Sequence, residues 1–296
     1  AVKAITKSIQ KRGHVSQVLH LDKIRIVVSN NAKGYDSIRY VQGGKSTMLS
    51  KSSIGNAVIP RIGSNVPYGI KVIDHITKNM GIYSCISSLG LYNAYDKMRT
   101  LQIASAQGIL TPKTFMGDNL KDYDYIASQL KLPVVIKFVH GSLGAGVSII
   151  ESMVGLKTTL QSFSKIKKPF LVQEFIDGGN KDIRAVVIGD RVVAAYQRKA
   201  NKGDFRANLA QKGTGKSISL SKEDQELCVK AAKALGLELC GVDLMKDQNG
   251  KSYLIEINSN LGWKVAEITN VDIGSEIIKH IEQKIRTLGN RKADLT

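Results

Sequence analysis

The sequence predicts a mixed α/β (α+β) protein of two or three domains, and three observations carry this prediction. At 296 residues the chain is long enough for a large hydrophobic core and for more than one domain. Segments with the two-residue period of strands alternate with segments that have the spacing of helices. Asn249-Gly250 separates two apolar runs of period two, which is the strongest short-range signal for a β-hairpin. Helices and antiparallel strands are therefore both expected.

The composition is that of an ordinary globular protein, with 43% hydrophobic and 23% charged residues. No apolar run approaches the ~20 residues that a membrane span needs, and the basic N-terminus lacks the apolar core of a signal peptide. Cys85, Cys228 and Cys240 are odd in number and too widely spaced for a zinc motif or a disulfide framework. A location in the reducing cytoplasm, with no membrane partner, is therefore expected.

The net charge of +18 is unevenly distributed. Residues 1–100 hold 15 Lys and Arg against 4 Asp, a balance of +11. Such a field favours an anionic partner, whether nucleic acid, a ribosome, or an acidic peptide or metabolite. The alternative is that dispersed lysines serve solubility alone, and the charge pattern leaves both interpretations open.

Residues 1–92 are expected to form an α/β domain that begins with a basic helix. Turn residues, among them Gly13, Gly34 and Gly44, separate the elements that follow. In order, we expect strands at Val15–Leu19, Ile24–Val28, Ser37–Val41 and Ala57–Ile59, a helix at Ile70–Met80, and a strand at Ile82–Ser84.

Residues 93–172 are expected to form a small α+β domain, and residues 173–296 a third domain. In the former, Gly108 is a plausible helix C-cap, and the elements are helices at Ala94–Gln107, Asp122–Gln129 and Leu156–Phe163 and strands at Leu132–Val139, Val147–Glu151 and Phe170–Phe175. In the latter, Gly189-Asp190 predicts a hairpin and Ser221 with Asp224 a helix start. Its elements are strands at Ile183–Ile188 and Arg191–Gln197, a helix from Ser221, the hairpin Cys240–Asn258, and a helix near Gly274–Leu288.

The hairpin Cys240–Asn258 predicts a cluster of oxygen ligands. If Asn249 and Gly250 form a two-residue turn, Asp243 lies directly opposite Glu256, and Asn258 lies two residues further on the same face. Two carboxylates and an amide oxygen suit a hard divalent cation that also holds the phosphates of a nucleotide. The alternative is an exposed hairpin face whose acidic residues bind no ligand. The apolar residues of both strands argue against such a solvated hairpin.

A glycine-rich stretch at 140–147 lies between two strands rather than between a strand and a helix. This position excludes a P-loop and a dinucleotide-binding fingerprint, both of which need a following helix. It leaves a hairpin tip whose backbone N–H groups could fold over phosphates, or a plain turn. Lys137, in the apolar run before this loop, must reach solvent or meet an anion.

Two further segments carry weaker signals. The backbone of the apolar strand Leu171–Ile176 could pair with an adenine edge, or the strand could be structural only. A polar loop is expected at Lys199–Lys216. In it, Arg206 and Asn208 could supply a guanidinium and an amide to a transferring phosphoryl group, or they could lie in a solvated turn. The five histidines have no ligand-like spacing.

Taken together and in this order, these motifs resemble the ATP-grasp superfamily, and most closely its RimK-type branch, the ribosomal-protein alpha-L-glutamate ligases and their relatives. The resemblance spans about residues 10–283. The motifs that carry it are P-R-I-G at 60–63, D-K at 96–97, V-I-K at 135–137, the glycine loop 141–146, V-Q-E-F-I at 172–176, D-I-R at 182–184, G-D-F-R-A-N-L at 203–209, G-V-D at 241–243 and E-I-N at 256–258.

The resemblance implies a three-domain ATP-grasp fold in which the nucleotide lies between the central and C-terminal domains. It implies ATP as the nucleotide and Mg²⁺, with Mn²⁺ as an alternative, as the metal. The implied roles are phosphate binding by Lys97, Lys137 and the loop residues Gly141, Ser142, Gly144 and Gly146; adenine contacts from Glu174 and Phe175; a ribose contact from Asp182; catalytic contacts from Lys137, Arg206 and Asn208; metal binding by Asp243, Glu256 and Asn258; and a substrate carboxylate on Arg61.

The implied activity is ATP-dependent ligation of a carboxylate to an amine through an acylphosphate. The favoured reaction adds L-glutamate to the C-terminus of an acidic protein or peptide, with a ribosomal protein as one candidate and a homo-oligomer as the expected assembly. The alternatives are the same chemistry on a small molecule or carrier protein, and a nucleic-acid- or ribosome-binding protein without catalysis.

Three departures from the branch stand out. The chain starts inside the first helix, where the branch has a preceding strand; Ser259–Gly262 replaces the usual A-S-P-G; and His140 stands where close relatives tend to have an acid.

Overall fold

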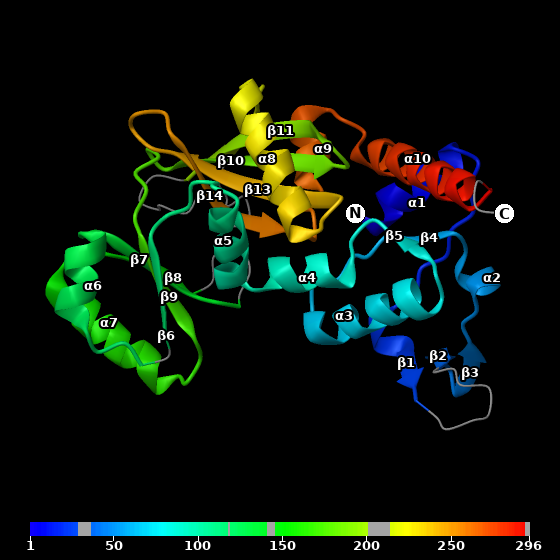
Figure 1. Ribbon diagram of the computed structural model, residues 1–296, viewed down its shortest axis with the longest axis horizontal. Coiled ribbons are helices and arrows are strands. Elements are labelled where there is room, and N and C mark those ends of the chain that lie inside the picture. The colour runs from blue at the N-terminus through cyan, green and yellow to red at the C-terminus, as the bar shows by residue number, and fades with distance from the viewer. Residues whose placement is uncertain (29–36, 118, 141–145, 201–213, 294–296) are drawn as a thin grey trace.

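The computed structural model describes residues 1–28, 37–117, 119–140, 146–200 and 214–293. Helices and strands are both abundant, as predicted, and the strands form sheets of three, five, two and four members. Figure 1 shows the four-stranded sheet with its helices at one end of the molecule, the five-stranded sheet in the middle, and the N-terminal segment at the other end. The larger sheets are antiparallel throughout, which gives the α+β arrangement.

The N-terminal segment is built around a small antiparallel sheet and a helix that covers it. Ile24, Ile38, Val72 and Ile76 share one buried cluster, so the apolar face of the sheet packs on the helical segment. The elements are α1 (Val2–Lys11), the 3-10 helix η1 (Leu21–Lys23), β1 (Ile24–Val27), β2 (Ser37–Gln42), β3 (Lys45–Met48), α2 (Lys51–Ile54), β4 (Ala57–Val58), α3 (Val66–Asp74), the π-helical turn η2 (His75–Asn79), β5 (Tyr83–Ser84) and α4 (Ser88–Tyr95).

Two expectations, one for this segment and one for the helix that follows it, are wrong. Val15–Leu19 is not a strand: the segment lies outside every described sheet, and Val15 is 99% exposed, so its alternating pattern meets no partner strand. The helix predicted at Ala94–Gln107 is two helices, α4 and α5 (Lys97–Ala106), because Asp96 is extended and its carboxylate accepts a hydrogen bond from the Arg99 N–H at 3.0 Å. This cap turns Asp96 into a helix start.

The central segment is a four-stranded sheet in the order β6-β9-β7-β8, with two helices packed against it. Phe170, Leu156 and Leu160 are fully buried between the sheet and the helices, because their apolar side chains fall on the facing surfaces. The elements are β6 (Thr114–Gly117), α6 (Tyr123–Leu130), β7 (Val134–Phe138), β8 (Val147–Ile150), α7 (Met153–Lys165) and β9 (Phe170–Glu174).

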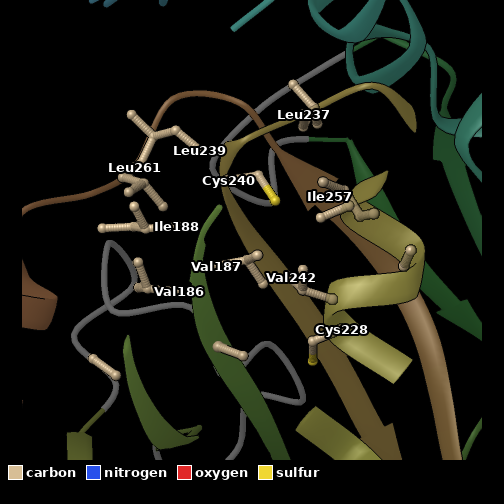
Figure 2. Packing of buried hydrophobic residues seen from close by; sticks show 14 of the residues in the cluster. Val186, Val187, Ile188, Cys228, Leu237, Leu239, Cys240, Val242, Ile257 and Leu261 are labelled. Carbon is tan, nitrogen blue, oxygen red and sulfur yellow. The ribbon is translucent and has the colours of Figure 1, made fainter. Parts of the chain in front are cut away.

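The C-terminal segment holds a five-stranded sheet in the order β12-β11-β10-β13-β14. The largest buried cluster includes residues from both faces of this sheet, and on one face Val187, Cys240 and Val242 lie near Cys228 of α8 (Figure 2). The elements are β10 (Lys181–Ile188), β11 (Arg191–Lys199), β12 (Thr214–Ser217), α8 (Lys222–Leu235), β13 (Leu239–Lys246), β14 (Ser252–Asn258), α9 (Lys264–Thr269) and α10 (Ile273–Ala293).

The first and last helices of the chain pack together. Helices α1 and α10 lie side by side in Figure 1, and the Arg12 guanidinium donates two hydrogen bonds to the Glu282 carboxylate. The basic N-terminal helix is therefore fastened to the last helix of the C-terminal segment.

The predicted pairing of Asp243 with Glu256 is confirmed, but the predicted turn is wrong. The connection has three residues, because the Gly250 N–H bonds the Asp247 carbonyl and the Asp247 N–H bonds the Lys251 carbonyl. This loop alone would place Asp243 opposite Ile255, and a bulge after Asp243 shifts the register by one residue and restores the pairing with Glu256. Two departures from the simplest hairpin thus cancel.

Candidate functional site

The polar residues of the five-stranded sheet gather on one face, opposite the side chains of Ile183, Ala185 and Val242. The strand period of two sends Ile183 and Ala185 into the core and leaves Asp182 and Arg184 on the other face of β10. Neighbouring strands add their own polar side chains at the same level. The face as a whole carries Asp182, Arg184, Arg198, Asp243, Glu256 and Asn258.

Asp243 lies at the centre of this face, 4% exposed, and two arginines hold it. Arg184 donates from Nε and Nη2, both at 2.5 Å, and Arg198 donates from Nη2 at 2.9 Å. Burial raises the pKa of Asp243, but the two guanidinium groups outweigh burial and hold that pKa at about 2. Asp243 is therefore an anion at neutral pH.

Arg198 also binds Asp182, with Nε and Nη2 each 2.5 Å from one carboxylate oxygen. For Asp182 the effect of burial prevails over the attraction of Arg198, and its pKa is raised. Asp182, predicted to meet a ribose, also lines a cavity of about 400 Å³ at the turn end of the sheet, with Asp177, Lys181 and Gln248. Asp182 thus belongs to the ion-pair cluster and also borders this cavity.

Glu256 and Asn258 form the more accessible part of the site. The Asn258 amide donates from Nδ2 to Glu256 Oε1 at 2.9 Å, and the same oxygen lies 3.8 Å from Arg184 Nη2. The Glu256 side chain is 30% exposed. Together with Asp243, these side chains offer two carboxylates and an amide oxygen in one patch, and an all-oxygen donor set fits Mg²⁺. The residues predicted to bind metal are therefore brought together.

Lys137 lies on β7 of the other sheet and faces this patch. Its side chain is buried, and Nζ donates to Gln173 Oε1 at 2.8 Å. Burial lowers the pKa of Lys137 to about 8, while Glu256 acts in the opposite sense and Lys97 adds to the lowering. Glu256 and Lys97, at the start of α5, thus both lie within electrostatic reach of Lys137, and the central and C-terminal sheets face each other across these charges.

The predicted adenine contact lies at the end of β9. The Glu174 N–H donates to the Lys113 carbonyl at 2.9 Å, and the Lys113 N–H donates to Glu174 Oε2 at 3.1 Å. The Glu174 N–H is therefore already used, and the adenine prediction depends on the Glu174 carbonyl and on Phe175.

Gly146 directly precedes β8 and has a φ of +71°, and a Cβ there would lie 2.8 Å from the Phe138 ring. A side chain at this position would be both strained and crowded, so the exit of the glycine loop requires glycine. The other predicted site residues lie outside the described residues: Gly141, Ser142, Gly144, Arg206 and Asn208.

Arg61 lies in the segment after β4, against the loop that follows Asn258. Its Nη2 donates to the Leu261 carbonyl across 200 residues of sequence. Its Nε and Nη1 are buried without a hydrogen-bond partner. The predicted substrate residue thus contacts the loop that follows the strand of Glu256 and Asn258, and its Nε and Nη1 have no hydrogen-bond partner.

Sequence reasoning missed Arg198 and Gln173. The turn at Gly189-Asp190 signals the β10–β11 hairpin, but counting from it pairs Asp182 with Gln197. A bulge that begins after Val186 shifts the pairing to Arg198. Gln173 lies in a strand whose sequence is mostly apolar and gives no sign of a polar partner; its contact with Lys137 follows from the β7–β9 pairing.

The fold and this charged site between two antiparallel sheets define an ATP-grasp protein, and the comparisons agree. The ATP-grasp ligase PsnB, solved with a phosphomimetic variant of a minimal precursor, Mg and ADP, matches with a TM-score of 0.70 at 19% identity, over 95% of this chain and 94% of that one. The macrocyclase MdnC from Microcystis aeruginosa, bound to its precursor peptide, matches with a TM-score of 0.70 at 15% identity, over 94% of each chain.

The sequence comparisons define the family. The model of the RimK-like ATP-grasp domain matches residues 94–281. A probable alpha-L-glutamate ligase of Marinomonas sp. is 40% identical over 77% of this chain and 76% of its own length. One from Thioalkalivibrio sulfidiphilus is 33% identical over 97% of this chain and 92% of its own. The chain belongs to the RimK-like ATP-grasp family and is a ligase, as the resemblance implied.

None of the helices in the described ranges is long and apolar enough to cross a membrane.

Proposed function

We propose that this protein ligates a carboxylate to an amine at the expense of ATP, through an acylphosphate. The favoured reaction adds L-glutamate to the C-terminal carboxylate of an acidic protein or peptide. The observation that carries the proposal is the opposition of a buried cation, Lys137, to the acidic patch of Glu256, Asn258 and Asp243. A nucleotide's phosphates need a cation on one side and metal-binding oxygens on the other.

The residues divide the work as follows. Lys137 and Lys97 bind the phosphates and hold the terminal phosphorus in line with the acceptor carboxylate. Asp243, Glu256 and Asn258 hold Mg²⁺, which neutralises phosphate charge when it is bound. Phe175 and the Glu174 carbonyl meet adenine, and Asp182 meets the ribose. Five further residues lie outside the described ranges. We propose that Gly141, Ser142 and Gly144 bind the phosphates and that Arg206 and Asn208 contact the reacting groups.

The reaction proceeds in two balanced steps. The acceptor carboxylate attacks the γ-phosphorus, the bond to the β-phosphate oxygen breaks, and ADP leaves. The amine of the amino acid then attacks the acyl carbon of the acylphosphate, and inorganic phosphate leaves as the amine gives up a proton. Exclusion of water protects the acylphosphate from hydrolysis.

The peptide acceptor is supported by charge and by likeness. PsnB and MdnC were solved with precursor peptides, and the curated relatives are named probable alpha-L-glutamate ligases. The +11 balance of residues 1–100 complements an acidic acceptor. A ribosomal protein is one such acceptor.

We also propose that the protein forms a homo-oligomer, that it lies in the cytoplasm, and that its domain boundaries fall after residues 92 and 172.

The test is phosphate release from Mg-ATP with each of the twenty amino acids, with and without an acidic peptide that ends in glutamate. Product mass is followed in parallel. A ladder of glutamate additions on the peptide supports the proposal. Turnover only with a small acceptor would replace the peptide by a metabolite, and no turnover together with salt-sensitive RNA binding would refute the ligase reaction.

A further inference from the structure

The small sheet of the N-terminal segment has an open edge at β3. The order of the sheet is β1-β2-β3, so among the described residues β3 pairs with β2 on one side only. All four residues of β3, Lys45–Met48, are exposed. An edge strand presents unpaired backbone N–H and C=O groups, on which another strand can form. The free edge of β3 is therefore a candidate docking surface.

The register shows which backbone groups of β3 point away from the sheet. The Leu49 N–H donates to the Ile38 carbonyl at 2.8 Å, so these two residues form a hydrogen-bonded pair. Successive residues of an antiparallel strand direct their N–H and C=O groups alternately to its two sides. Counting back along the register, the groups of Met48 and Ser46 point away from β2, and those of Thr47 point toward it. Two residues thus offer hydrogen bonds to an added strand.

Two arginines lie opposite each other on the outer face of this sheet. Arg25 of β1 and Arg39 of β2 are direct partners in the register. Each follows an isoleucine, Ile24 or Ile38, that is buried in the core under the sheet, so the alternation of a strand puts both arginines on the other face. Like charges that are placed directly opposite each other destabilise a strand pair. An anion beside them would remove this repulsion.

Neither arginine has a carboxylate partner in the described ranges. Arg25 Nη1 donates to the carbonyls of Asp22 and Ile24 at 2.6 and 2.7 Å. Arg39 Nε donates to Ser46 Oγ at 2.7 Å, and its Nη2 lies 3.5 Å from the Ser46 carbonyl. The Arg39 guanidinium is thus held at the free edge of β3, where an incoming strand would meet it.

The charge around this edge is positive. Within residues 21–28 and 37–51 there are five basic residues and one acidic residue, a balance of +4. The outer face also exposes apolar surface, since Val27 is 38% and Met48 58% exposed. A strand from a second copy of this chain would bring the same positive charge and be repelled, whereas an acidic strand is attracted. The basic residues are Lys23, Arg25, Arg39, Lys45 and Lys51, and the acid is Asp22.

We propose that an acidic segment of the acceptor protein or peptide adds to the free edge of β3 as a further strand. This inference deepens the proposed function, because it names where the acceptor docks, and it rests on that function. The backbone groups of Ser46 and Met48 hold the segment, and the Arg39 guanidinium binds a carboxylate on its outer face. Main-chain hydrogen bonds supply affinity, and the arginine selects for acidic side chains.

An extended peptide fits this surface better than a nucleic acid does. The phosphates of RNA would meet the arginines but leave the strand backbone and the Met48 side chain unused, whereas a peptide uses all three. Figure 1 shows β1, β2 and β3 at one end of the molecule and the four-stranded central sheet at the other. The docked segment therefore lies away from the carboxylate that reacts, which suits a protein or a long peptide and not a metabolite.

The test measures equilibrium binding of labelled synthetic peptides to the full chain by fluorescence anisotropy. The first probe has a run in which glutamate alternates with valine, then a glycine-serine linker and a C-terminal glutamate pair. Two further probes carry backbone N-methyl groups on the valines alone or on the glutamates of the run alone. Because alternate N–H groups of an added strand face β3, one methylated probe should lose at least about 10-fold in affinity and the other should bind like the first.

Two substitutions address the same edge. Arg39→Glu should weaken binding of the first probe about 10-fold, and the loss should shrink at high salt. Met48→Pro removes an outward N–H without removing a bond to β2 and should weaken binding about 5-fold. The matched controls are Met48→Ala, which keeps that N–H, and Arg286→Glu on an exposed part of α10. Both should change the affinity less than about 2-fold.

Equal affinities for the two methylated probes, or unchanged binding in Arg39→Glu, would overturn the proposal. Binding of polyuridylate that Arg39→Glu weakens, without binding of the peptide, would assign the surface to RNA. A change in sedimentation of Met48→Pro without peptide would assign it to a second copy of the chain. If Met48→Pro has a lower thermal midpoint than Met48→Ala, the methylated probes and Arg39→Glu decide.

Ligation is measured separately, with a glutamate dipeptide too short to reach the edge as the acceptor. Arg39→Glu should leave its turnover unchanged. An active ligase in which Arg39→Glu and N-methylation leave peptide binding intact refutes the β3 site alone. Edge-dependent peptide binding by a protein that releases no phosphate from ATP refutes the proposed function and, with it, the role of the peptide as acceptor.

Discussion

Replacing Arg198 with methionine should destabilise the protein by about 3–5 kcal/mol, although methionine is apolar and reproduces the aliphatic stem of arginine. The Arg198 side chain is 3% exposed and its guanidinium makes three charge-assisted hydrogen bonds, two to Asp182 and one to Asp243. Removing one partner of a buried ion pair leaves the other charge uncompensated, and this penalty is about 3–5 kcal/mol. Arg184 still binds Asp243, so the penalty falls mainly on Asp182.

A double-mutant cycle isolates that penalty. Asp182→Asn in the Arg198→Met background removes the uncompensated charge and should restore about 2–3 kcal/mol, so the two substitutions should be strongly non-additive. The pKa of Asp182, already raised by burial, should rise further in Arg198→Met. The single variant should therefore lose less stability at pH 5 than at pH 8, because the folded protein then takes up a proton on Asp182.

The assay is urea unfolding of the four proteins at both pH values. Arg191→Met is the control: it removes an exposed arginine that pairs with Glu276 and should cost under about 1 kcal/mol. A change of less than 1 kcal/mol in Arg198→Met, or additive effects in the double variant, would show that Arg198 does not compensate Asp182.

Three further predictions follow from single residues. Lys137→Met should stabilise the protein by roughly 3 kcal/mol at pH 7, because burial lowers the pKa of Lys137 in the folded protein from 10.5 to about 8. The unfolded chain holds this proton more tightly, so the stability gained by the variant should shrink as pH rises from 8 to 10.5. A difference in urea midpoint that does not change with pH would contradict this. Glu256→Gln retains an acceptor for the Asn258 amide and should keep the fold while phosphate release falls at least 100-fold (an order-of-magnitude expectation for loss of a metal-binding charge), whereas Glu223→Gln on α8 should leave the rate unchanged. Gly250→Ala should cost about 1 kcal/mol of stability through its φ of +78° alone, since a Cβ there meets nothing within 4 Å. The control Gly262→Ala is equally open but has no positive φ, so it should cost less. Equal thermal midpoints for the two variants would refute the argument.

Much of the site was predictable because its residues lie on strands with a clear two-residue period. Alternation places Glu256 and Asn258 on one face whatever the turn, and their hydrogen bond agrees with that placement. The pairing of Asp243 with Glu256 was predicted from a two-residue turn that the protein does not have. It holds because a longer loop and a bulge offset each other.

Arg198 shows the opposite outcome. The same counting from Gly189-Asp190 pairs Asp182 with Gln197. The β10–β11 pairing contains one bulge, so the register shifts by one residue and Asp182 pairs with Arg198 instead. Bulges arise from how a strand bends over its core, and residue order alone carries little signal for them.

The α+β class, the faces of the strands and the RimK-like motifs can be recognised from residue order, because they depend on local periodicity and short spacing. Which charged groups come into contact depends instead on how the sheets pack. Lys137 and Glu256 come from different sheets, and Arg61 reaches the Leu261 carbonyl across 200 residues of sequence. Burial then sets their chemistry: it lowers the pKa of Lys137, and it lowers the pKa of Arg61, whose Nε and Nη1 are buried without a hydrogen-bond partner. Such desolvation is a property of packing, which no single stretch of sequence contains.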